Sequence, residues 1–292
     1  MQPSSTNPPH YPLPWLLALK LSGAILARRS RSFRDDSRYA LSLLRPAVRV
    51  LGEENIPSHG PAIITMNHYY RPGFRAWWLA LGISALVPVE IHWVMAAAWT
   101  YPGQFLGRQR TAITRWVFER VDEVYDFTTM PPMPPAPEEI EERARAVRKV
   151  LEKVRALTSN EGNLSGCSSF NRPIIGLSPE GGDNLMRTLI RPPSGVGRFV
   201  LHLNRLGLPI HPVGAFESEL PFRSELLFRQ DGASELPFRS ELPFRFTLHF
   251  GSAYQLDMPG GLSPDERDCQ AAEVVMRKIA ALLPPELRGE FA

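Results

Sequence analysis

The sequence has little cysteine and no long apolar run. Its two cysteines, Cys167 and Cys269, are too few for a disulfide framework and make no metal-ligand pattern. They favour a reducing compartment over secretion. The apolar run Trp15–Leu26 falls short of the roughly 20 residues that an ordinary membrane-spanning helix needs. A disulfide-stabilised secreted domain and a membrane-embedded chain are therefore both disfavoured.

Two common signatures of α/β enzymes are also missing. A serine hydrolase needs Gly-x-Ser-x-Gly, but the stretch Gly176–Glu180 has Glu where the second glycine belongs. Dinucleotide binding needs Gly-x-Gly-x-x-Gly, but the stretch that begins at Gly195 ends with Val200 in the last glycine position. Neither class is supported.

The composition is that of a globular protein with an uneven charge. Of 292 residues, 43% are hydrophobic and 22% charged, which allows a sizeable core. Residues 1–50 hold eight basic and two acidic residues, a net charge of +6 that leaves −3 for the remainder. Aromatic and aliphatic neighbours of these basic residues favour an anionic membrane surface over nucleic acid as the partner.

The Trp15–Leu26 run, followed by Arg28 and Arg29, predicts an interfacial helix. We therefore expect residues 1–45 to form a tail and a basic amphipathic helix region that lies on the membrane. A core helix with a solvated basic end is the alternative.

Strand and helix patterns alternate through the rest of the chain. They predict an α/β fold: a single domain over 46–292, with a mixed, mostly parallel sheet flanked by helices. The expected helices lie near 14–28, 35–44, 73–84, 105–119, 138–157, 199–206 and 263–282, and the expected strands at 47–51, 63–66, 90–94, 121–127, 174–177, 209–216 and 246–250. Residues 95–99 fit either a longer strand or a helix.

Two of the predicted helices carry clear local signals. In the helix after the proline run 131–137, Ile140, Ala144, Val147, Leu151, Val154 and Leu157 share one face. The last helix opens on Ser263-Pro264-Asp265-Glu266, a capping box with proline in the first turn, and presents Val275, Ile279 and Leu282 as its apolar face.

Residues 218–245 contain the hexapeptide Ser-Glu-Leu-Pro-Phe-Arg three times and one near copy. A period of six over so few residues is too short for a solenoid. Because the repeat separates two predicted strands, we interpret it as an inserted surface loop. A loop that dips into a membrane is the alternative.

Two turns carry the candidate chemistry. Asn67-His68 follows an apolar strand and precedes an apolar helix, and Pro179-Glu180-Gly181 follows another apolar strand. The ends of such strands are where α/β proteins usually place their active sites. A base at one turn, and an acid with free backbone N–H groups at the other, suggest acyl or phosphoryl transfer. Structural roles for both turns are the alternative.

The order and surroundings of these turns resemble the glycerolipid acyltransferase family, over about residues 45–282. The resemblance implies that His68 is the general base and that Asn67, Glu180 and Gly181 bind the substrate. Glu180 and Gly181 would hold the glycerol or phosphate of the acceptor. The family's motif Asp falls on Gly73, and its Thr-Arg on Gly182-Asp183. Arg187, Arg191 or Arg198 would then take over the phosphate contact.

The resemblance further implies acyl transfer from a thioester to the hydroxyl of a lysophospholipid or glycerol phosphate, in phospholipid biosynthesis or remodelling. Acyl-CoA or an acyl-carrier protein would be the co-substrate, with no bound cofactor and no metal. The expected location is peripheral, on the cytoplasmic face of the membrane. Because of Gly73, a catalytically impaired lipid-binding member of the same fold is the alternative.

Overall fold

The computed structural model describes residues 11, 14–69, 74, 76–101, 103–131, 137–159, 173–181, 187–219 and 244–292. Its centre is a seven-stranded sheet in the order β1-β7-β6-β2-β5-β3-β4. Neighbouring strands are parallel except for the antiparallel pair β6 and β7. The strands are β1 (Arg49–Leu51), β2 (Ala62–Met66), β3 (Ile91–Ala96), β4 (Thr128–Met130), β5 (Ile174–Leu177), β6 (Ile210–Glu219) and β7 (Phe244–Phe250).

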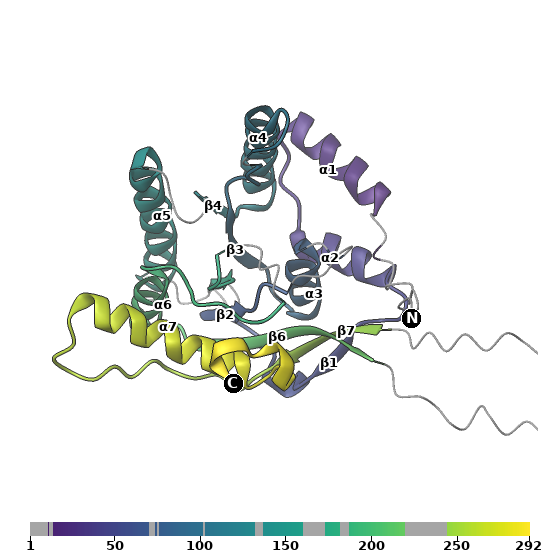
Figure 1. The fold of residues 1–292 in the computed structure, drawn as a ribbon. Helices are drawn as coiled ribbons and strands as arrows, with labels where there is room; N and C mark the ends of the chain where they lie inside the picture. Colours follow the sequence, from purple (N-terminus) through teal and green to yellow (C-terminus); the bar gives the residue numbers. More distant parts are fainter. Residues whose placement is uncertain are drawn as a thin grey trace, which may run out of the picture.

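Seven α-helices surround this sheet in the described part of the chain (Figure 1). They are α1 (Trp15–Ala27), α2 (Phe33–Ser42), α3 (Trp77–Leu86), α4 (Gly107–Tyr125), α5 (Ile140–Ser159), α6 (Val196–Arg205) and α7 (Pro264–Ala280). Short 3₁₀ turns occupy Glu53–Asn55, Pro137–Glu139, Pro285–Leu287 and Gly289–Phe291. The predicted fold class, a mostly parallel α/β sheet flanked by helices, is confirmed.

Helices cover both faces of the sheet. On one face, Gly82 of α3 approaches Leu248 and Phe246 of β7, and α2 packs against α3. The next β7 residue, His249, points to the other face, where its Nδ1 lies 3.0 Å from the carbonyl oxygen of Leu282, just after α7. Helices α6 and α7 pack together on that second face. Because both faces are covered, every residue of β2 and β5 is buried, as their continuous apolar runs predict.

The predicted strand at 121–127 is wrong. Helix α4 continues to Tyr125 and ends at Asp126, whose φ of 56° is left-handed, before β4 begins at Thr128. Val121, Val124 and Tyr125 have the i, i+3, i+4 spacing of a helix face, and they pack in or against the core. The helix predicted as one option for residues 95–99 is absent as well, because β3 extends to Ala96 and irregular chain follows.

The buried face of α5 differs in part from the prediction. Ala146, Val150 and Val154 are buried, whereas Ile140 and Ala144 are exposed. The sequence offers two adjoining apolar stripes on this helix, and packing against β4 and α6 selects between them. The burial of Leu157 lies outside the described residues.

The last helix forms as predicted. Ser263 and Glu266 make the reciprocal capping box, and Val275 and Ile279 are buried. The same helix also fixes its neighbour. The buried carboxylate of Asp268 accepts hydrogen bonds from the backbone N–H groups of Gly195 (2.6 Å) and Arg198 (2.7 Å) at the start of α6.

The hexapeptide repeat lies mostly outside the described residues, which omit 220–243. Its first and last residues extend β6 and β7, where Glu219 pairs with Phe244. The repeat therefore joins two antiparallel neighbours, as expected for an inserted hairpin connection.

Candidate active site

The two candidate turns meet at one edge of the sheet. Strands β2 and β5 are parallel neighbours with Thr65 opposite Leu177. Their carboxyl ends therefore lie together, so that Ser178 and Gly181 follow β5 beside the point where His68 follows β2. We call this side of the sheet the carboxyl edge. The sequence placed both turns after strands, and the structure makes those strands adjacent.

Asn67 holds the His68 turn through its amide side chain. Nδ2 donates to the carbonyl oxygen of Ala215 (2.9 Å), and Oδ1 accepts from the N–H of the same residue (2.7 Å). Asn67 is buried, and these two bonds extend the pairing of β2 with β6 by one step past Met66. In this structure the amide of Asn67 bonds the backbone of β6.

Glu180 holds the same turn from the other side. Its Oε2 accepts a hydrogen bond from the backbone N–H of His68, and its Oε1 accepts from the N–H of Ile190 (3.0 Å). The carboxyl is buried, and burial raises its pKa although both N–H bonds oppose that shift. The carboxylate thus contacts the backbone of the candidate base and links it to the 187–191 segment.

Two of the predicted phosphate ligands lie on that segment. Arg187 is exposed and has a left-handed φ of 62°. Arg191 is also exposed and pairs with Glu290 near the end of the chain (3.1 Å). Both flank Ile190, which Glu180 ties to the His68 turn, so the segment belongs to the carboxyl edge. Gly73, in the position of the motif Asp, lies outside the described residues.

A cavity of about 550 Å³ opens on this edge, and we call it the apolar cavity. His68, Ser178 and Gly181 line one part of it. The remaining walls are mostly aliphatic and aromatic side chains from α1, α3, β3 and α4, including Leu17, Trp77, Trp93, Val117 and Phe118. Its volume suits a drug-sized or lipid-like ligand. The sequence predicted the turn residues but gave no indication that α4 would complete this cavity.

The hydroxyl of Ser178 is notable within the cavity. It is buried and has no hydrogen-bond partner among the residues that the structure describes. A buried hydroxyl without a partner is costly, and a bound ligand could supply the missing bond. In the sequence, Ser178 is only the central residue of the incomplete Gly-x-Ser-x-Gly stretch, which did not support a role for it.

An aromatic cluster, also unpredicted, adjoins the His68 turn. Tyr69 directly follows His68, and its hydroxyl lies 3.2 Å from Oε2 of Glu217 on β6. Tyr11, from the N-terminal segment, donates to the other carboxylate oxygen of Glu217. Both tyrosines make edge contacts with Phe74, with ring centroids 5.4 and 4.9 Å apart. Tyr11 is therefore held next to the turn that carries the candidate base.

Helix α1 has two apolar faces. Leu17, Ala18 and Leu21 line the cavity, while the opposite side exposes large apolar residues to solvent. Helix α4 lies beside α1 (Figure 1). Its first half also exposes large apolar residues, Ile113 and Trp116. We define the docking surface as the exposed residues Trp15, Leu19, Leu26, Phe105, Leu106, Ile113 and Trp116.

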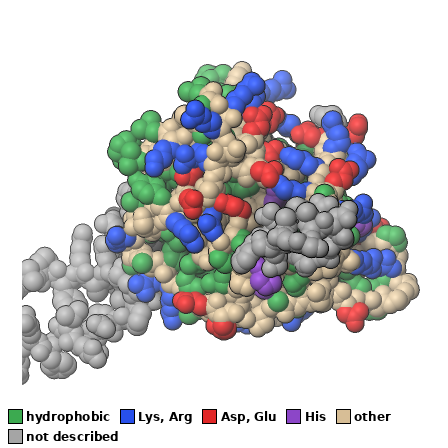
Figure 2. Space-filling model, turned by 180° about the vertical axis from the view of Figure 1, so that it is seen from behind, with side chains coloured by type: hydrophobic (Ala, Val, Ile, Leu, Met, Phe, Trp, Pro, Cys, Tyr) green, Lys and Arg blue, Asp and Glu red, His purple; other side chains and the backbone are tan. Residues whose placement is uncertain are grey.

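Basic residues border the docking surface. Arg28 and Arg29 follow α1, and Arg108 and Arg110 lie in α4; all four are exposed. Hydrophobic side chains gather among Lys and Arg at the upper end of the molecule in Figure 2. No helix in the described part of the chain is long and apolar enough to cross a bilayer. Exposed apolar residues on α1 are consistent with peripheral association.

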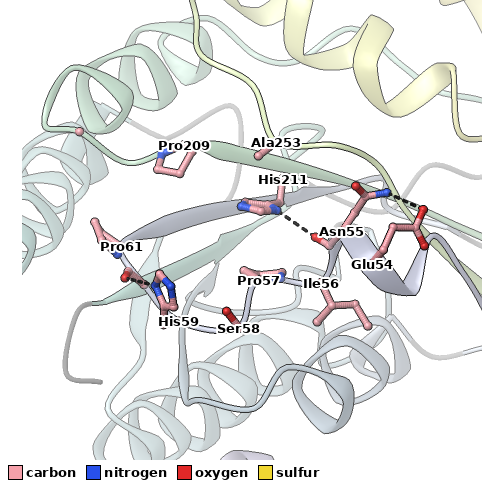
Figure 3. Close-up of a pocket in the computed structure, with 12 residues that line it drawn as sticks. Glu54, Asn55, Ile56, Pro57, Ser58, His59, Pro61, Pro209, His211 and Ala253 are labelled. Atoms are coloured by element: carbon pink, nitrogen blue, oxygen red, sulfur yellow. Dashed lines mark hydrogen bonds between the residues drawn. The ribbon is translucent and has the colours of Figure 1, made fainter. Parts of the chain in front are cut away.

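A second pocket lies at the opposite, amino edge of the sheet, and we call it the amino-edge pocket (Figure 3). It measures about 620 Å³ and is lined by Asn55, Ser58, His59, Pro61, His211 and neighbouring residues. Nδ1 of His59 lies 3.0 Å from the carbonyl oxygen of Gly60, and Nδ1 of His211 lies 3.1 Å from that of Asn55. Both imidazoles thus bond backbone carbonyls.

Comparisons with known proteins give one finding on the fold. No protein-family model matches the sequence, and no curated protein matches it significantly. The structure is similar to the crystal structure of the 1-acyl-sn-glycerophosphate acyltransferase PlsC from Thermotoga maritima. The sequences are 17% identical, the similarity covers 92% of this chain and 95% of that one, and the TM-score is 0.47. A similarity at that level concerns the fold alone.

Proposed function

We propose that this protein is an O-acyltransferase that moves an acyl group from a thioester to the hydroxyl of a lysophospholipid or glycerol phosphate. The observation that carries the proposal is the apolar cavity beside His68. A chain of methylenes gains about 0.8 kcal/mol for each CH₂ that it buries in such walls. The cavity would thereby hold an acyl chain with its reactive end near the imidazole.

The reaction needs a base and a stabilised oxyanion. The imidazole of His68 accepts the proton of the acceptor hydroxyl while the hydroxyl oxygen attacks the thioester carbonyl. Ser178 donates a hydrogen bond to the oxyanion of the tetrahedral intermediate. The C–S bond then breaks, and the leaving thiolate takes the proton back from the imidazolium. Asn67 and Glu180 fix the backbone of the base, and Gly181, Arg187 and Arg191 lie where an anionic headgroup would approach.

The substrates follow from the same surfaces. Acyl-CoA or an acyl-carrier protein supplies the thioester, and the acceptor comes from an anionic membrane whose surface the protein binds peripherally, on its cytoplasmic face. The docking surface would enter the interface and bring the cavity, which α1 shares, against the lipid. Arg28, Arg29, Arg108 and Arg110 would meet headgroup phosphates, each contributing on the order of 1 kcal/mol.

The direct test uses purified protein, radiolabelled acyl donors and anionic liposomes that contain a panel of lysophospholipids. We expect labelled product with at least one acceptor and none with His68→Ala. Absence of product with every donor and acceptor, from protein that is folded and bound to the liposomes, would contradict the proposal.

A second candidate function is lipid binding without turnover, on the same cavity. It is favoured by Gly73, which removes the carboxylate that would orient the base in the resembled family, and by Glu180, which contacts the backbone of His68. In this case His68→Ala would leave lipid binding unchanged, and no acyl donor would be consumed.

A further inference from the structure

Arg143 is the one side chain with a full charge among the described residues that line the apolar cavity. It lies in the first turn of α5. Its side chain reaches Pro131, the residue that follows β4. The residue is only partly exposed, and burial lowers the pKa of its guanidinium. A cation in an apolar wall is costly unless an anion offsets it.

The structure provides no such anion from the described part of the protein. There, Arg143 makes no ion pair, and its Nη1 lies 3.5 Å from the carbonyl oxygen of Pro131, a long hydrogen bond. Two glutamates near it in sequence are engaged elsewhere. Arg115 of α4 contacts Glu139 at 2.7 Å and Glu142 at 3.4 Å.

Arg115 provides an internal comparison. Arg115 lies on α4 and Arg143 on α5, and both are partly buried. Hydrogen bonding to Glu139 raises the pKa of Arg115, whereas burial lowers that of Arg143. The fold thus neutralises one guanidinium with two carboxylates and directs the other into a cavity whose described walls hold no counter-ion. A structural arginine would be expected to resemble Arg115.

We propose that Arg143 binds the phosphate of a ligand whose apolar chain fills the cavity. A guanidinium suits phosphate because its parallel N–H groups match two oxygens at once. The inference deepens the proposed function and rests on it for the source of the phosphate. It adds a binding residue outside both sequence turns, on a helix that carried no functional signal.

The position of Arg143 indicates whether the phosphate belongs to the acyl donor or to the acceptor. β4 is three strands from β2, which at about 4.8 Å per strand amounts to roughly 14 Å across the sheet. In a glycerol phosphate acceptor the phosphate is only a few bonds from the reacting hydroxyl. In the donor, a long pantetheine arm separates the phosphate from the thioester sulfur. The separation therefore favours the phosphate of the donor.

Binding can be tested without turnover. Calorimetry would compare decyl phosphate with decanol, each below its aggregation limit, on the parent protein, Arg143→Gln, Arg143→Lys and Arg145→Gln. Arg145 is the matched control because it is exposed on the same helix. We expect the parent to prefer decyl phosphate by roughly ten- to a hundredfold. Arg143→Gln should lose that preference, Arg143→Lys should keep part of it, and Arg145→Gln should keep it all.

Two results would overturn the proposal: equal affinity of the parent for both probes, or an unchanged preference in folded Arg143→Gln. Neither depends on acyl transfer, so binding by Arg143 can be tested even if the protein is inactive. If transfer is observed, the KM values identify the source. A higher KM for the donor alone assigns the phosphate to the donor, and a higher KM for the acceptor alone assigns it to the acceptor. Unchanged KM values for both would also refute the site.

Discussion

The two edges of the sheet carry cavities of similar size and different character. Pro61, just before β2, lines the amino-edge pocket, and Met66, the last residue of β2, lines the apolar cavity. The pocket at the start of the strand measures about 620 Å³ and the cavity at its end about 550 Å³. Volume therefore does not distinguish them, and their lining does.

Histidines make the contrast clearest. His59 and His211 in the amino-edge pocket each place Nδ1 against a backbone carbonyl, and burial lowers the pKa of His211. There, the imidazoles serve as hydrogen-bond partners of backbone carbonyl groups in the loops. At the carboxyl edge, Asn67 and Glu180 satisfy the backbone around His68, and the imidazole lines the cavity. The surroundings of a histidine, more than its presence in a pocket, indicate its role.

The largest expected effect separates these histidines directly. We expect His68→Ala to reduce acyl transfer by roughly 10²–10⁴-fold, the usual cost of losing a general base, with little change in thermal stability. His211→Ala should retain most of the activity, because its pocket lies at the other edge. Steady-state kinetics with circular dichroism melts would check both. Equal losses in the two variants would remove the distinction between the edges.

A serine at each edge gives a second, smaller contrast. Ser178→Ala removes a buried donor beside His68, and we expect kcat to fall by roughly 10²-fold, as for the loss of one oxyanion donor. Ser58→Ala, in the amino-edge pocket, should leave kcat unchanged. An increase in KM with normal kcat for Ser178→Ala would assign its hydroxyl to ground-state binding instead.

Glu180→Gln tests whether the carboxyl edge is held by its buried acid. An amide can accept from only one of the two N–H groups that Glu180 now serves, so one is left without an acceptor. We expect unfolding free energy to fall by about 1–3 kcal/mol. A drop in transfer should accompany it, because the turn that carries His68 loosens.

The same variant has a pH signature. Since burial raises the folded-state pKa of Glu180, the stability that this carboxyl adds is complete below its unfolded pKa, near 4.5. That stability is lost as pH rises through the higher folded value. The gap in melting temperature between parent and Glu180→Gln should therefore be widest near pH 4.5 and narrow toward neutral pH. A gap that grows with pH would mean that the charged form is the stabilised one.

The smallest expected effect concerns the docking surface. It shares helix α1 with the apolar cavity. Trp15→Ser combined with Leu19→Ser should weaken flotation with anionic liposomes by roughly tenfold, since two apolar side chains no longer enter the interface. High salt should weaken binding of the parent further, through its arginines. Leu43→Ser is the matched control, as an exposed leucine beyond that surface. Equal flotation of all three proteins would refute the proposed orientation.

Local pattern was sufficient for much of the fold. Continuous apolar runs marked β2, β5 and β6 as buried strands, and the capping box fixed the start of α7. The two turns at His68 and Glu180 followed from the strands before them. These features depend on residues a few positions apart, so a single sequence can encode them. Gly73 and residues 220–243 of the repeat lie outside the described residues, so the predictions about them remain predictions from sequence.

Tertiary packing decided what local pattern left open. Val121–Tyr125 fits a strand or a helix in isolation, and burial of one helical face extended α4. The roles of Asn67 and Glu180 depend on partners 148 and 112 residues away. Arg143 differs from Arg115 because the carboxylates of Glu139 and Glu142 pair with Arg115 of α4. Sequence determined the elements and the two turns, while strand order and helix packing, which act between distant residues, determined the cavity and the side chains that face it.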